Sequence, residues 1–330
     1  MGAGMGATEA VGTMEAGAGK GAIVAGGADA AGSPRPVALR VSVPATSANL
    51  GVGFDCLGVA LDLRAAFTMR GAKELRVTGC EERFRGRDNL VWTTYLDTCA
   101  TLGVRPEPLE IDIDSPVPLS GGLGSSSTCV VAGVMAALER AGRSDDLELA
   151  LDLATKAEGH PDNVAPAVLG GLVSSFVKGE VTTSTRMDVA EGVRLVAIAP
   201  PYEVRTADAR QVLPKRVTLE TCVWQVGRAV ACVRALETGD LELMAKACED
   251  RLHEPYRKRL IPDYDALRAA ALEAGAAAFV ISGSGSTMLA VCNGDEVAAR
   301  VAERANGVRE GLWVRAMGAS AEGVVVERLP

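Results

Sequence analysis

A segment rich in glycine and serine, residues 118–128 with the sequence PLSGGLGSSST, has the residue types best suited to binding phosphate. Glycine allows backbone N–H groups to approach a ligand closely. A helix that begins directly after such a loop points its positive N-terminal end at the bound group. Apolar residues with helical spacing do follow from Val130 onward. The segment therefore predicts an anion site suited to a triphosphate.

The glycine spacing distinguishes this loop from two other phosphate loops. No Gly-Lys-Ser/Thr triplet follows, as a Walker A loop requires, and glycines at 121, 122 and 124 do not fit the dinucleotide pattern G-x-G-x-x-G. A flexible turn is the alternative interpretation, and the strand pattern before the loop and the helix pattern after it count against that. A serine hydrolase is also disfavoured, because the chain has no G-x-S-x-G elbow.

Strand and helix patterns around the loop indicate the elements that must position it. Alternating or continuous apolar residues predict strands over 37–43, 109–113, 193–199, 279–281 and 288–291. Helical spacing predicts helices over 130–138, 145–157 and 265–274. We expect Ser144 to cap the second helix and Gly142 and Gly275 to follow the ends of the first and third. Strands and helices do not alternate regularly, so the pattern favours an α+β fold over a doubly wound sheet.

Length and composition indicate a soluble, two-domain protein. The chain has 330 residues, 48% hydrophobic and 23% charged, with a formal net charge of −8. The acidic balance argues against nucleic acid as a partner, and no charge-free apolar run is long enough to span a membrane. The eight cysteines are scattered and form no C-x-x-C pair, which indicates reduced thiols. Because thiols stay reduced in the cytoplasm, we expect a cytoplasmic protein.

The first residues differ in composition from the rest of the chain. Residues 1–36 are rich in glycine and alanine without a steady apolar period, so we predict a disordered tail or a start codon assigned too early. A chain that begins near residue 33 should then keep its stability and activity. We place two domains after this tail, over residues 37–190 and 191–330, with the boundary next to the polar stretch 178–188.

Three segments in order resemble the motifs of the GHMP kinases, small-molecule kinases that use ATP. They are PATSANLGVGFD at 44–55, PLSGGLGSSST at 118–128 and ISGSGSTMLAV at 281–291. Within that superfamily the chain resembles the homoserine kinases most, through PATSANLGVGFD and three further segments: EGHPDNVAPAVLGG at 158–171, VRTADARQVLP at 204–214 and HEPYRKRL at 253–260. The resemblance implies an N-terminal domain like ribosomal protein S5 and a C-terminal ferredoxin-like α/β plait.

The resemblance also implies which residues bind ATP and magnesium. Ser126 and Glu158 match the positions that reach Mg²⁺, which prefers oxygen ligands. Asn89 resembles an adenine-contacting position, and a turn residue after Arg87-Asp88 is the alternative for it. Residues 283–286 of the third motif are expected beside the phosphate loop. The complete predicted ATP-binding set is Pro118, Leu119, Ser120, Gly121, Gly122, Leu123, Gly124, Ser125, Ser126, Ser127, Thr128 and Asn89.

The predicted substrate is L-homoserine, whose α-amino and α-carboxylate groups must be held while its hydroxyl faces the γ-phosphate. The resemblance implies the contacts Asn49, His160, Asn163, Thr206, Arg210 and Arg257. A guanidinium group suits this task because it binds a carboxylate bidentately. Some relatives use an aspartate as general base where this chain has Asn163, which cannot accept a proton at neutral pH.

Phosphoryl transfer depends mainly on positioning and charge neutralisation, so a strong base is dispensable. We therefore predict catalytic roles for Asn163, Ser126 and Glu158, with the proton leaving through the γ-phosphate or a water, and a capping or packing role for Asp162. The main alternative is another GHMP kinase, acting on a mevalonate-type or sugar substrate, and a ligand sensor that kept the fold is a further one. The sequence leaves the oligomeric state open, a homodimer included.

Overall fold

The computed structural model describes residues 34–119 and 121–330, so the tail predicted over residues 1–36 lies outside the described residues up to position 33. The described strands are β1 (Ala38–Ala48), β2 (Leu57–Gly71), β3 (Arg76–Thr78), β4 (Leu109–Asp114), β5 (Leu172–Lys178), β6 (Val181–Met187), β7 (Val193–Ala199), β8 (Ala278–Ile281), β9 (Met288–Asn293), β10 (Trp313–Met317) and β11 (Val325–Arg328).

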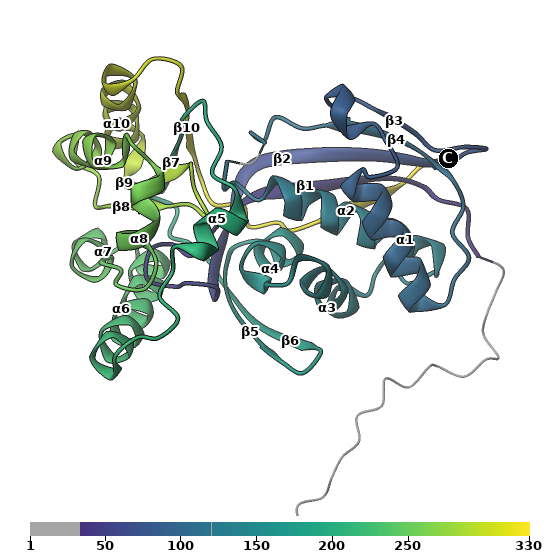
Figure 1. Cartoon of the computed structure of the whole chain (residues 1–330), viewed down its shortest axis with the longest axis horizontal. Helices are drawn as coiled ribbons and strands as arrows, with labels where there is room; N and C mark the ends of the chain where they lie inside the picture. Colours follow the sequence, from purple (N-terminus) through teal and green to yellow (C-terminus); the bar gives the residue numbers. More distant parts are fainter. Residues whose placement is uncertain (1–33, 120) are drawn as a thin grey trace, which may run out of the picture. The chain divides into compact units, whose positions relative to one another are not determined.

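Helices of very different lengths connect these strands (Figure 1). The α-helices are α1 (Leu90–Leu102), α2 (Ser125–Arg140), α3 (Leu147–Glu158), α4 (Pro161–Leu169), α5 (Thr206–Gln211), α6 (Leu219–Thr238), α7 (Leu241–Ala247), α8 (Glu254–Arg257), α9 (Tyr264–Glu273) and α10 (Gly294–Val308). Two short 3₁₀ helices are η1 (Glu82–Phe84) and η2 (Lys258–Leu260).

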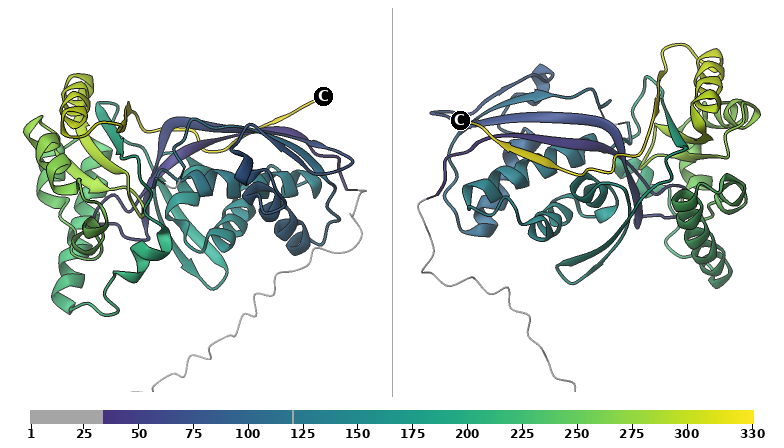
Figure 2. Two further views of the ribbon diagram at one scale, coloured as in Figure 1. Left: turned by 45° about the horizontal axis from the view of Figure 1, so that its top comes forward. Right: turned by 180° about the vertical axis from the view of Figure 1, so that it is seen from behind.

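The larger sheet has seven strands and holds the first part of the chain. Its main path runs β11-β1-β2-β4-β3, and β5 pairs with both β2 and β6. All these pairs are antiparallel except β3 with β4. The alternating residues Leu39, Val41 and Val43 of β1 are fully buried, as their period predicted. Figures 1 and 2 show helices α1 to α4 against one face of this sheet.

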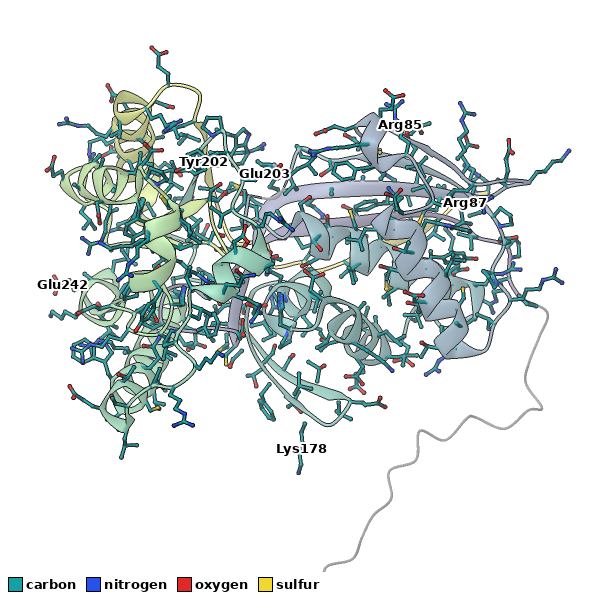
Figure 3. The ribbon with its side chains drawn as sticks, viewed as in Figure 1. Arg85, Arg87, Lys178, Tyr202, Glu203 and Glu242 are labelled. Atoms are coloured by element: carbon teal, nitrogen blue, oxygen red, sulfur yellow. The ribbon has the colours of Figure 1, made fainter. Side chains whose placement is uncertain are left out.

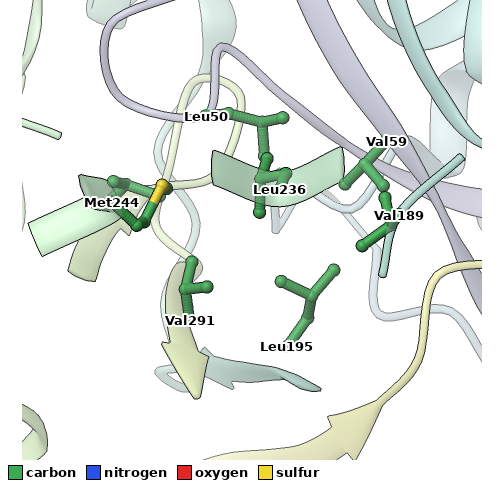
Figure 4. Close-up of a pocket in the computed structure, with 8 residues that line it drawn as sticks. Leu50, Val59, Val189, Leu195, Leu236, Met244 and Val291 are labelled. Carbon is green, nitrogen blue, oxygen red and sulfur yellow. The ribbon is translucent and has the colours of Figure 1, made fainter. Parts of the chain in front are cut away.

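The smaller sheet has the antiparallel order β10-β7-β9-β8. Neighbouring residues of β7 enter different cores: Val196 and Ile198 pack with α9 and α10, whereas Leu195 and Ala197 pack with the core of the larger sheet. Figure 4 shows side chains of this second packing. They enclose a small apolar cavity of about 10 Å³. Its lining residues are Leu50, Val59, Val189, Leu195, Leu236, Met244, Val280 and Val291.

The chain passes from the larger to the smaller sheet between β6 and β7. The domain boundary at residue 190 stays a prediction. The end of the chain then returns, because β11 pairs with β1 through the register Val41↔Val326. The larger sheet thus contains both ends of the described chain. The fold is α+β, as predicted, and the strands predicted over 193–199 and 109–113 are β7 and β4.

One predicted helix cap is wrong. Helix α3 begins at Leu147, and its N-cap is Asp146, whose carboxylate accepts the backbone N–H of Leu149 at 3.0 Å. Ser144, the predicted cap, accepts a hydrogen bond from Arg328 at 2.7 Å instead. A carboxylate two residues later in the sequence thus replaces the serine as the acceptor for the first turn.

Three further observations concern the described residues. No helix within 34–119 or 121–330 is long and apolar enough to cross a membrane. In the same residues, no three histidine, cysteine, aspartate or glutamate side chains gather in a way that could hold a metal by themselves. All eight cysteines lie in this part of the chain and are free thiols.

Candidate active site

A cavity of about 850 Å³ brings together residues from both parts of the chain. It is bordered by the phosphate loop, the loop after β1, the start of α4, the segment from β7 to α5, and α8. Glu203, on the segment between β7 and α5, is one of its lining residues and is labelled in Figure 3. The predicted site residues that line the cavity are Asn49, Asn89, Leu119, Gly121, Gly122, Gly124, Ser125, Ser126, Ser127, Thr128, Glu158, His160, Asn163, Thr206, Arg210 and Arg257.

The phosphate loop can take its path only because two of its residues are glycine. Gly122 and Gly124 have φ values of 87° and 69°, in the left-handed region that side chains disfavour. A Cβ atom at Gly122 would lie 2.2 Å from the carbonyl oxygen of Ser282, and one at Gly124 would lie 2.1 Å from the hydroxyl of Thr46. Any side chain at these positions would push the loop away from its two supports.

Those supports come from the first and third motifs. The backbone N–H of Thr46 in β1 donates to the carbonyl of Leu123 at 3.1 Å. From the third motif, the N–H of Thr287 donates to the carbonyl of Gly121 at 2.9 Å, and the hydroxyl of Ser282 donates to that of Gly122 at 2.6 Å. The third motif therefore lies beside the phosphate loop, as predicted, and α2 begins at Ser125 directly behind it.

Two serines at the start of α2 face the carboxylate that ends α3. The hydroxyl of Ser126 donates to Glu158 Oε2 and that of Ser127 donates to Oε1, both at 3.2 Å. Ser126 is exposed to the cavity, whereas Ser127 is almost fully buried. Burial raises the pKa of Glu158, against the opposing effects of the charge of His160 and the two serine hydrogen bonds.

His160 and Asp162 form a second polar pair next to Glu158. Asp162 is buried, and its Oδ1 lies 2.5 Å from His160 Nδ1. Burial lowers the pKa of His160, but the hydrogen bond and charge of Asp162, together with the charge of Glu158, outweigh it and raise the pKa overall. Asp162 therefore fixes the imidazole rather than capping α4, whose N-cap is His160 itself.

Asn163 lies in the first turn of α4 and reaches back to β1. Its Oδ1 accepts a hydrogen bond from the hydroxyl of Thr46 at 2.8 Å. This contact fixes which end of the amide is oxygen, so the NH₂ end is a donor available for other contacts. Asn163 is partly exposed and lines the cavity, which leaves its amide accessible to a ligand.

Asp55 and Arg210 form a bidentate ion pair at the far end of the cavity. Arg210 Nη1 and Nη2 donate to the two carboxylate oxygens of Asp55, both at 3.1 Å. The two side chains are 40% and 34% exposed, so water and a small ligand can reach the pair. Asp55 is a functional candidate that the sequence reasoning missed, although it ends the quoted segment PATSANLGVGFD and is its one charged residue.

Arg257 is the second predicted arginine, and unlike Arg210 it is buried. Its Nε donates to the carbonyl of Ala209 at 3.2 Å, and its Nη1 donates to that of Gly283 at 2.8 Å. Its guanidinium carbon lies 5.0 Å from the centre of the Phe54 ring. Burial lowers its pKa, opposed by the charge of Asp55. These contacts fix one edge of the Arg257 guanidinium group, and the residue still lines the cavity.

Asn49 and Thr206 line the same end with side chains that already contact the protein. The Nδ2 of Asn49 donates to the carbonyl of Gly283 at 2.8 Å, and its Oδ1 accepts the N–H of Asp55 at 3.0 Å. The hydroxyl of Thr206 lies 3.4 Å from that of Ser284. Asn49 therefore orders the loop that carries Asp55, and its predicted contact with substrate remains a prediction.

The opposite end of the cavity is more apolar. Asn89 lines it, but its amide caps α1: Oδ1 accepts the N–H groups of Val91 and Trp92 at 3.0 and 3.3 Å, and Nδ2 donates to the carbonyl of Phe84 at 2.8 Å. The turn-residue alternative thus describes its local contacts well. Phe84 and Leu90 line this end and are 37% and 38% exposed, which suits the flat faces of a nucleobase.

Two described residues of the predicted ATP-binding set, Leu123 and Pro118, are not among the residues that line the cavity. Leu123 is fully buried in the core, where it anchors the loop instead of facing the cavity. Pro118 is outside the set of described residues that line the cavity. Ser120 lies outside the described residues.

Comparison with known protein families gives two matches in chain order. The family described as GHMP kinases N terminal domain matches residues 89–171, and the family described as GHMP kinases C terminal matches residues 232–308. The first match contains the phosphate loop, Glu158 and Asn163. The second contains Arg257.

Curated relatives and solved structures agree with these matches. A homoserine kinase of Clostridium beijerinckii is 40% identical over 77% of this chain and 86% of its own length. The crystal structure of homoserine kinase from Cytophaga hutchinsonii superposes with a TM-score of 0.79, at 32% identity over 88% of this chain and 98% of that one. A mevalonate kinase of L. major superposes with a TM-score of 0.68 at 15% identity, which is a likeness of fold alone.

Proposed function

The chain belongs to the homoserine kinase family of the GHMP kinases, and from this premise we propose that it transfers the γ-phosphoryl group of ATP to the side-chain hydroxyl of L-homoserine. The products are ADP and O-phospho-L-homoserine. The observation that carries the proposal is that one cavity joins a phosphate loop to a paired carboxylate and guanidinium, Asp55 and Arg210.

The phosphate loop is the ATP half of this proposal. Its backbone is fixed by Thr46, Ser282 and Thr287, and α2 begins at its end. The first N–H groups of a helix have no partner within the helix and attract phosphate oxygens. The apolar end with Phe84 and Leu90 then receives the adenine.

Ser126 and Glu158 fit a magnesium ion bound together with the phosphates. A hydroxyl and a carboxylate are the hard oxygen donors that Mg²⁺ takes, and few protein ligands are needed because phosphate and water supply the rest. Glu158 accepts hydrogen bonds from Ser126 and Ser127 in the first turn of α2, where the phosphates are expected to bind. When bound, Mg²⁺ neutralises charge that develops on the γ-phosphoryl group.

The other end of the cavity matches the two charges of an amino acid. The ammonium group of homoserine needs an acceptor, which Asp55 offers, and its carboxylate needs a fork, which Arg210 and Arg257 offer. In the structure Asp55 and Arg210 bind each other at 3.1 Å. A zwitterion that binds between them replaces this one ion pair by two. Until substrate binds, the internal pair keeps both side chains ordered.

Asn163 is placed to orient the hydroxyl that attacks. Thr46 holds its oxygen, which directs the NH₂ group outward to donate to the substrate oxygen. Asn163 itself takes no proton, so the proton of the hydroxyl passes to the γ-phosphate or to a water as the new P–O bond forms and the bond to the ADP oxygen breaks. His160, fixed by Asp162, lies close enough to both Glu158 and Arg210 for their charges to act on its pKa, and we assign it to substrate contact.

A coupled ADP-release assay with homoserine, mevalonate, galactose and shikimate tests the proposal. We expect kcat/KM for homoserine to exceed that of the others by about 100-fold or more, since a site built for a charged group rejects molecules that lack it. Equal or faster turnover of mevalonate or a sugar would contradict the proposal and favour the alternative GHMP kinase activity.

A variant sharpens this test at the ammonium group. In Asp55→Asn, kcat/KM for homoserine should fall about 10- to 100-fold, as for a lost charge-assisted contact. Turnover of 4-hydroxybutyrate, which lacks the amino group, should be low in both proteins and nearly unchanged by the substitution. A cytoplasmic location and a homodimer remain further parts of the proposal that follow from the family.

A further inference from the structure

The loop between β1 and β2, residues 49–55, follows a backbone path that side chains disfavour. Asn49, Leu50 and Asp55 have φ values of 71°, 45° and 56°, in the left-handed region, and none of them is glycine. Such a conformation costs free energy and persists only where surrounding contacts hold it. Asp55, at the end of this loop, is the proposed partner of the substrate ammonium group. The loop therefore needs contacts that keep Asp55 in place.

Two buried side chains from outside the loop supply such contacts. His253 Nε2 lies 2.7 Å from the carbonyl oxygen of Gly51, and Gln225 Nε2 donates to that of Val52 at 2.8 Å. His253 is fully buried, and Gln225 is almost fully buried. A buried carbonyl that loses its donor costs free energy, so these two hydrogen bonds favour this path of the loop over others.

The contact with Gly51 also determines where His253 carries its proton. A carbonyl oxygen only accepts, so Nε2 holds the proton and donates it. Burial lowers the pKa of His253, although the charge of Asp250 opposes this effect, and the imidazole is therefore neutral. The same ring stacks on Phe54 of the loop, with the ring centres 5.2 Å apart. His253 thus holds the loop through a polar and an aromatic contact.

Asp250 joins these two side chains to the helix that carries Arg257. Its Oδ1 accepts a hydrogen bond from Gln225 Nε2 at 2.6 Å, and its Oδ2 accepts the backbone N–H groups of His253 and Glu254, both at 2.7 Å. Helix α8 begins at Glu254 and ends at Arg257. One buried polar cluster, made of Gln225, Asp250 and His253, therefore connects the loop after β1 with the helix of the second substrate arginine.

We propose that His253 and Gln225 are positioning residues that hold Asp55 where it binds the ammonium group of homoserine. This inference rests on the proposed function. Both side chains lie in the described part of the chain and neither is among the residues that line the cavity, so they act without touching substrate. The apparent affinity of a site falls with the fraction of molecules in the competent conformation. Loss of either side chain should therefore weaken homoserine and spare ATP.

Steady-state kinetics of His253→Leu and His253→Gln test the role of the histidine. Leucine has a similar size and no donor, so we expect KM for homoserine to rise about tenfold or more, while KM for ATP changes by less than about twofold. Glutamine keeps a side-chain N–H donor and should recover much of the affinity. Equal effects on both KM values, no effect of His253→Leu, or a glutamine variant as weak as the leucine variant would contradict the proposal.

Combination with Asp55→Asn separates positioning from general stability. If His253 acts through Asp55, adding His253→Leu to Asp55→Asn should lower kcat/KM for homoserine by less than about threefold, because the carboxylate that it positions is already gone. Independent effects would multiply, and a further loss as large as that of His253→Leu alone would overturn the proposal. Turnover of 4-hydroxybutyrate, which has no ammonium group, should be the same in His253→Leu and wild type.

Gln225→Met gives a second test that leaves the histidine in place. Methionine fills a similar volume without a donor, so KM for homoserine should rise here too, and a wild-type KM would remove Gln225 from the proposal. Tyr95→Phe is the matched control. The buried hydroxyl of Tyr95 accepts the backbone N–H of Glu107 at 3.1 Å, so its removal also breaks a contact between a buried side chain and the backbone, away from the loop. It should lower stability and leave both KM values unchanged.

Hydrogen exchange of backbone amides, followed by mass spectrometry, tests the loop without an activity assay. In His253→Leu the amides of residues 49–55 should exchange faster, whereas those of α2 should exchange as in wild type. Unchanged exchange in the loop overturns the bracing role. A wild-type chain that does not phosphorylate homoserine overturns the proposed function instead, and with it the role of Asp55, so the two failures are distinguishable.

Discussion

The phosphate end and the amino-acid end of the cavity are built in different ways. At the phosphate end, one continuous loop and the first turn of α2 present backbone N–H groups, and a single distant residue, Glu158, completes the set. At the amino-acid end, the charged groups come from the loop after β1, the start of α4, the end of α5 and α8. The backbone groups that face a ligand at the first end lie in one stretch of sequence, although Thr46, Ser282 and Thr287 hold that stretch in place. The charged groups of the second end come together from four separate stretches.

The difference also concerns what the two ends tolerate. Backbone groups keep their function when most side chains change, provided that Gly122 and Gly124 stay glycine. Side-chain charges such as Asp55 and Arg210 lose their function with one substitution, and each leaves a partner unpaired. We therefore expect substitutions at the two ends to affect different kinetic constants.

The largest effect should come from Glu158→Gln at the phosphate end. Loss of the carboxylate leaves the developing charge on the γ-phosphoryl group less neutralised, and we expect kcat to fall by about 100- to 1,000-fold, equivalent to about 2.7–4 kcal/mol. Ser126→Ala should act in the same direction. Glu148→Gln, an exposed position on the same helix, is the control, and kcat as a function of magnesium concentration is the measurement. Wild-type kcat in Glu158→Gln would remove this residue from the site.

At the amino-acid end, Arg210→Ala should lower kcat/KM for homoserine, which corresponds to an activation free energy higher by about 2–3 kcal/mol. KM for ATP should stay the same. The amino-acid head is remote from the reacting hydroxyl, so its binding energy serves to orient that hydroxyl. Arg210→Lys should recover only part of the loss, because an ammonium group cannot offer two parallel donors.

The exposed Arg216→Ala is the matched control for this loss. With 3-aminopropan-1-ol, which lacks the carboxylate, wild type and Arg210→Ala should turn over equally slowly. If Arg210→Ala weakened ATP instead and spared homoserine, the arginine would belong to the phosphate end and the comparison between the two ends would fail.

This contrast also explains what could be predicted from the sequence. The phosphate loop and its flanking elements could be predicted because their signals lie within short stretches of residues, whereas the roles of Glu158 and Arg210 were implied only by the resemblance to the GHMP kinases and stay predictions. The Asp55–Arg210 pair joins positions far apart in the chain, and no spacing rule connects them. The one wrong helix cap has a similar cause: Ser144 and Asp146 are both good caps, and Ser144 instead contacts Arg328 of β11, which is distant in the sequence.

The support of the amino-acid end should respond to pH. Glu254, which begins the helix that carries Arg257, is buried, and burial raises its pKa from 4.5 to about 8. One oxygen of its carboxyl group accepts the N–H of Ile281, the first residue of the third motif, at 2.6 Å. The folded protein then holds this proton more tightly than the unfolded chain, so between about pH 4.5 and 8 the free energy of unfolding should fall as pH rises.

Urea unfolding at pH 5.5 and pH 8 measures this dependence. In Glu254→Gln the amide oxygen can still accept from Ile281, and the decrease in stability over this range should shrink by at least about 1 kcal/mol. Glu242→Gln is the control, because Glu242 is exposed on α7, as Figure 3 shows. An identical pH dependence in wild type and Glu254→Gln would mean that the buried carboxyl is not the titrating group.

The smallest effect is expected where the two ends meet, at Asn163. If positioning dominates the reaction, Asn163→Asp should not raise kcat, because a carboxylate adds negative charge beside the γ-phosphate and provides a base that a loose transition state does not need. It also removes the NH₂ donor, although the hydrogen bond from the Thr46 hydroxyl to the side-chain oxygen can persist. We expect kcat equal to that of the wild type or lower by less than about tenfold, with an unchanged pH profile. Asn163→Ala separates the two causes, since it removes the donor without adding charge. A large gain in kcat for Asn163→Asp, with a new acidic limb in the pH profile, would show that proton removal limits the native enzyme and that Asn163 is not the residue that orients an already reactive hydroxyl.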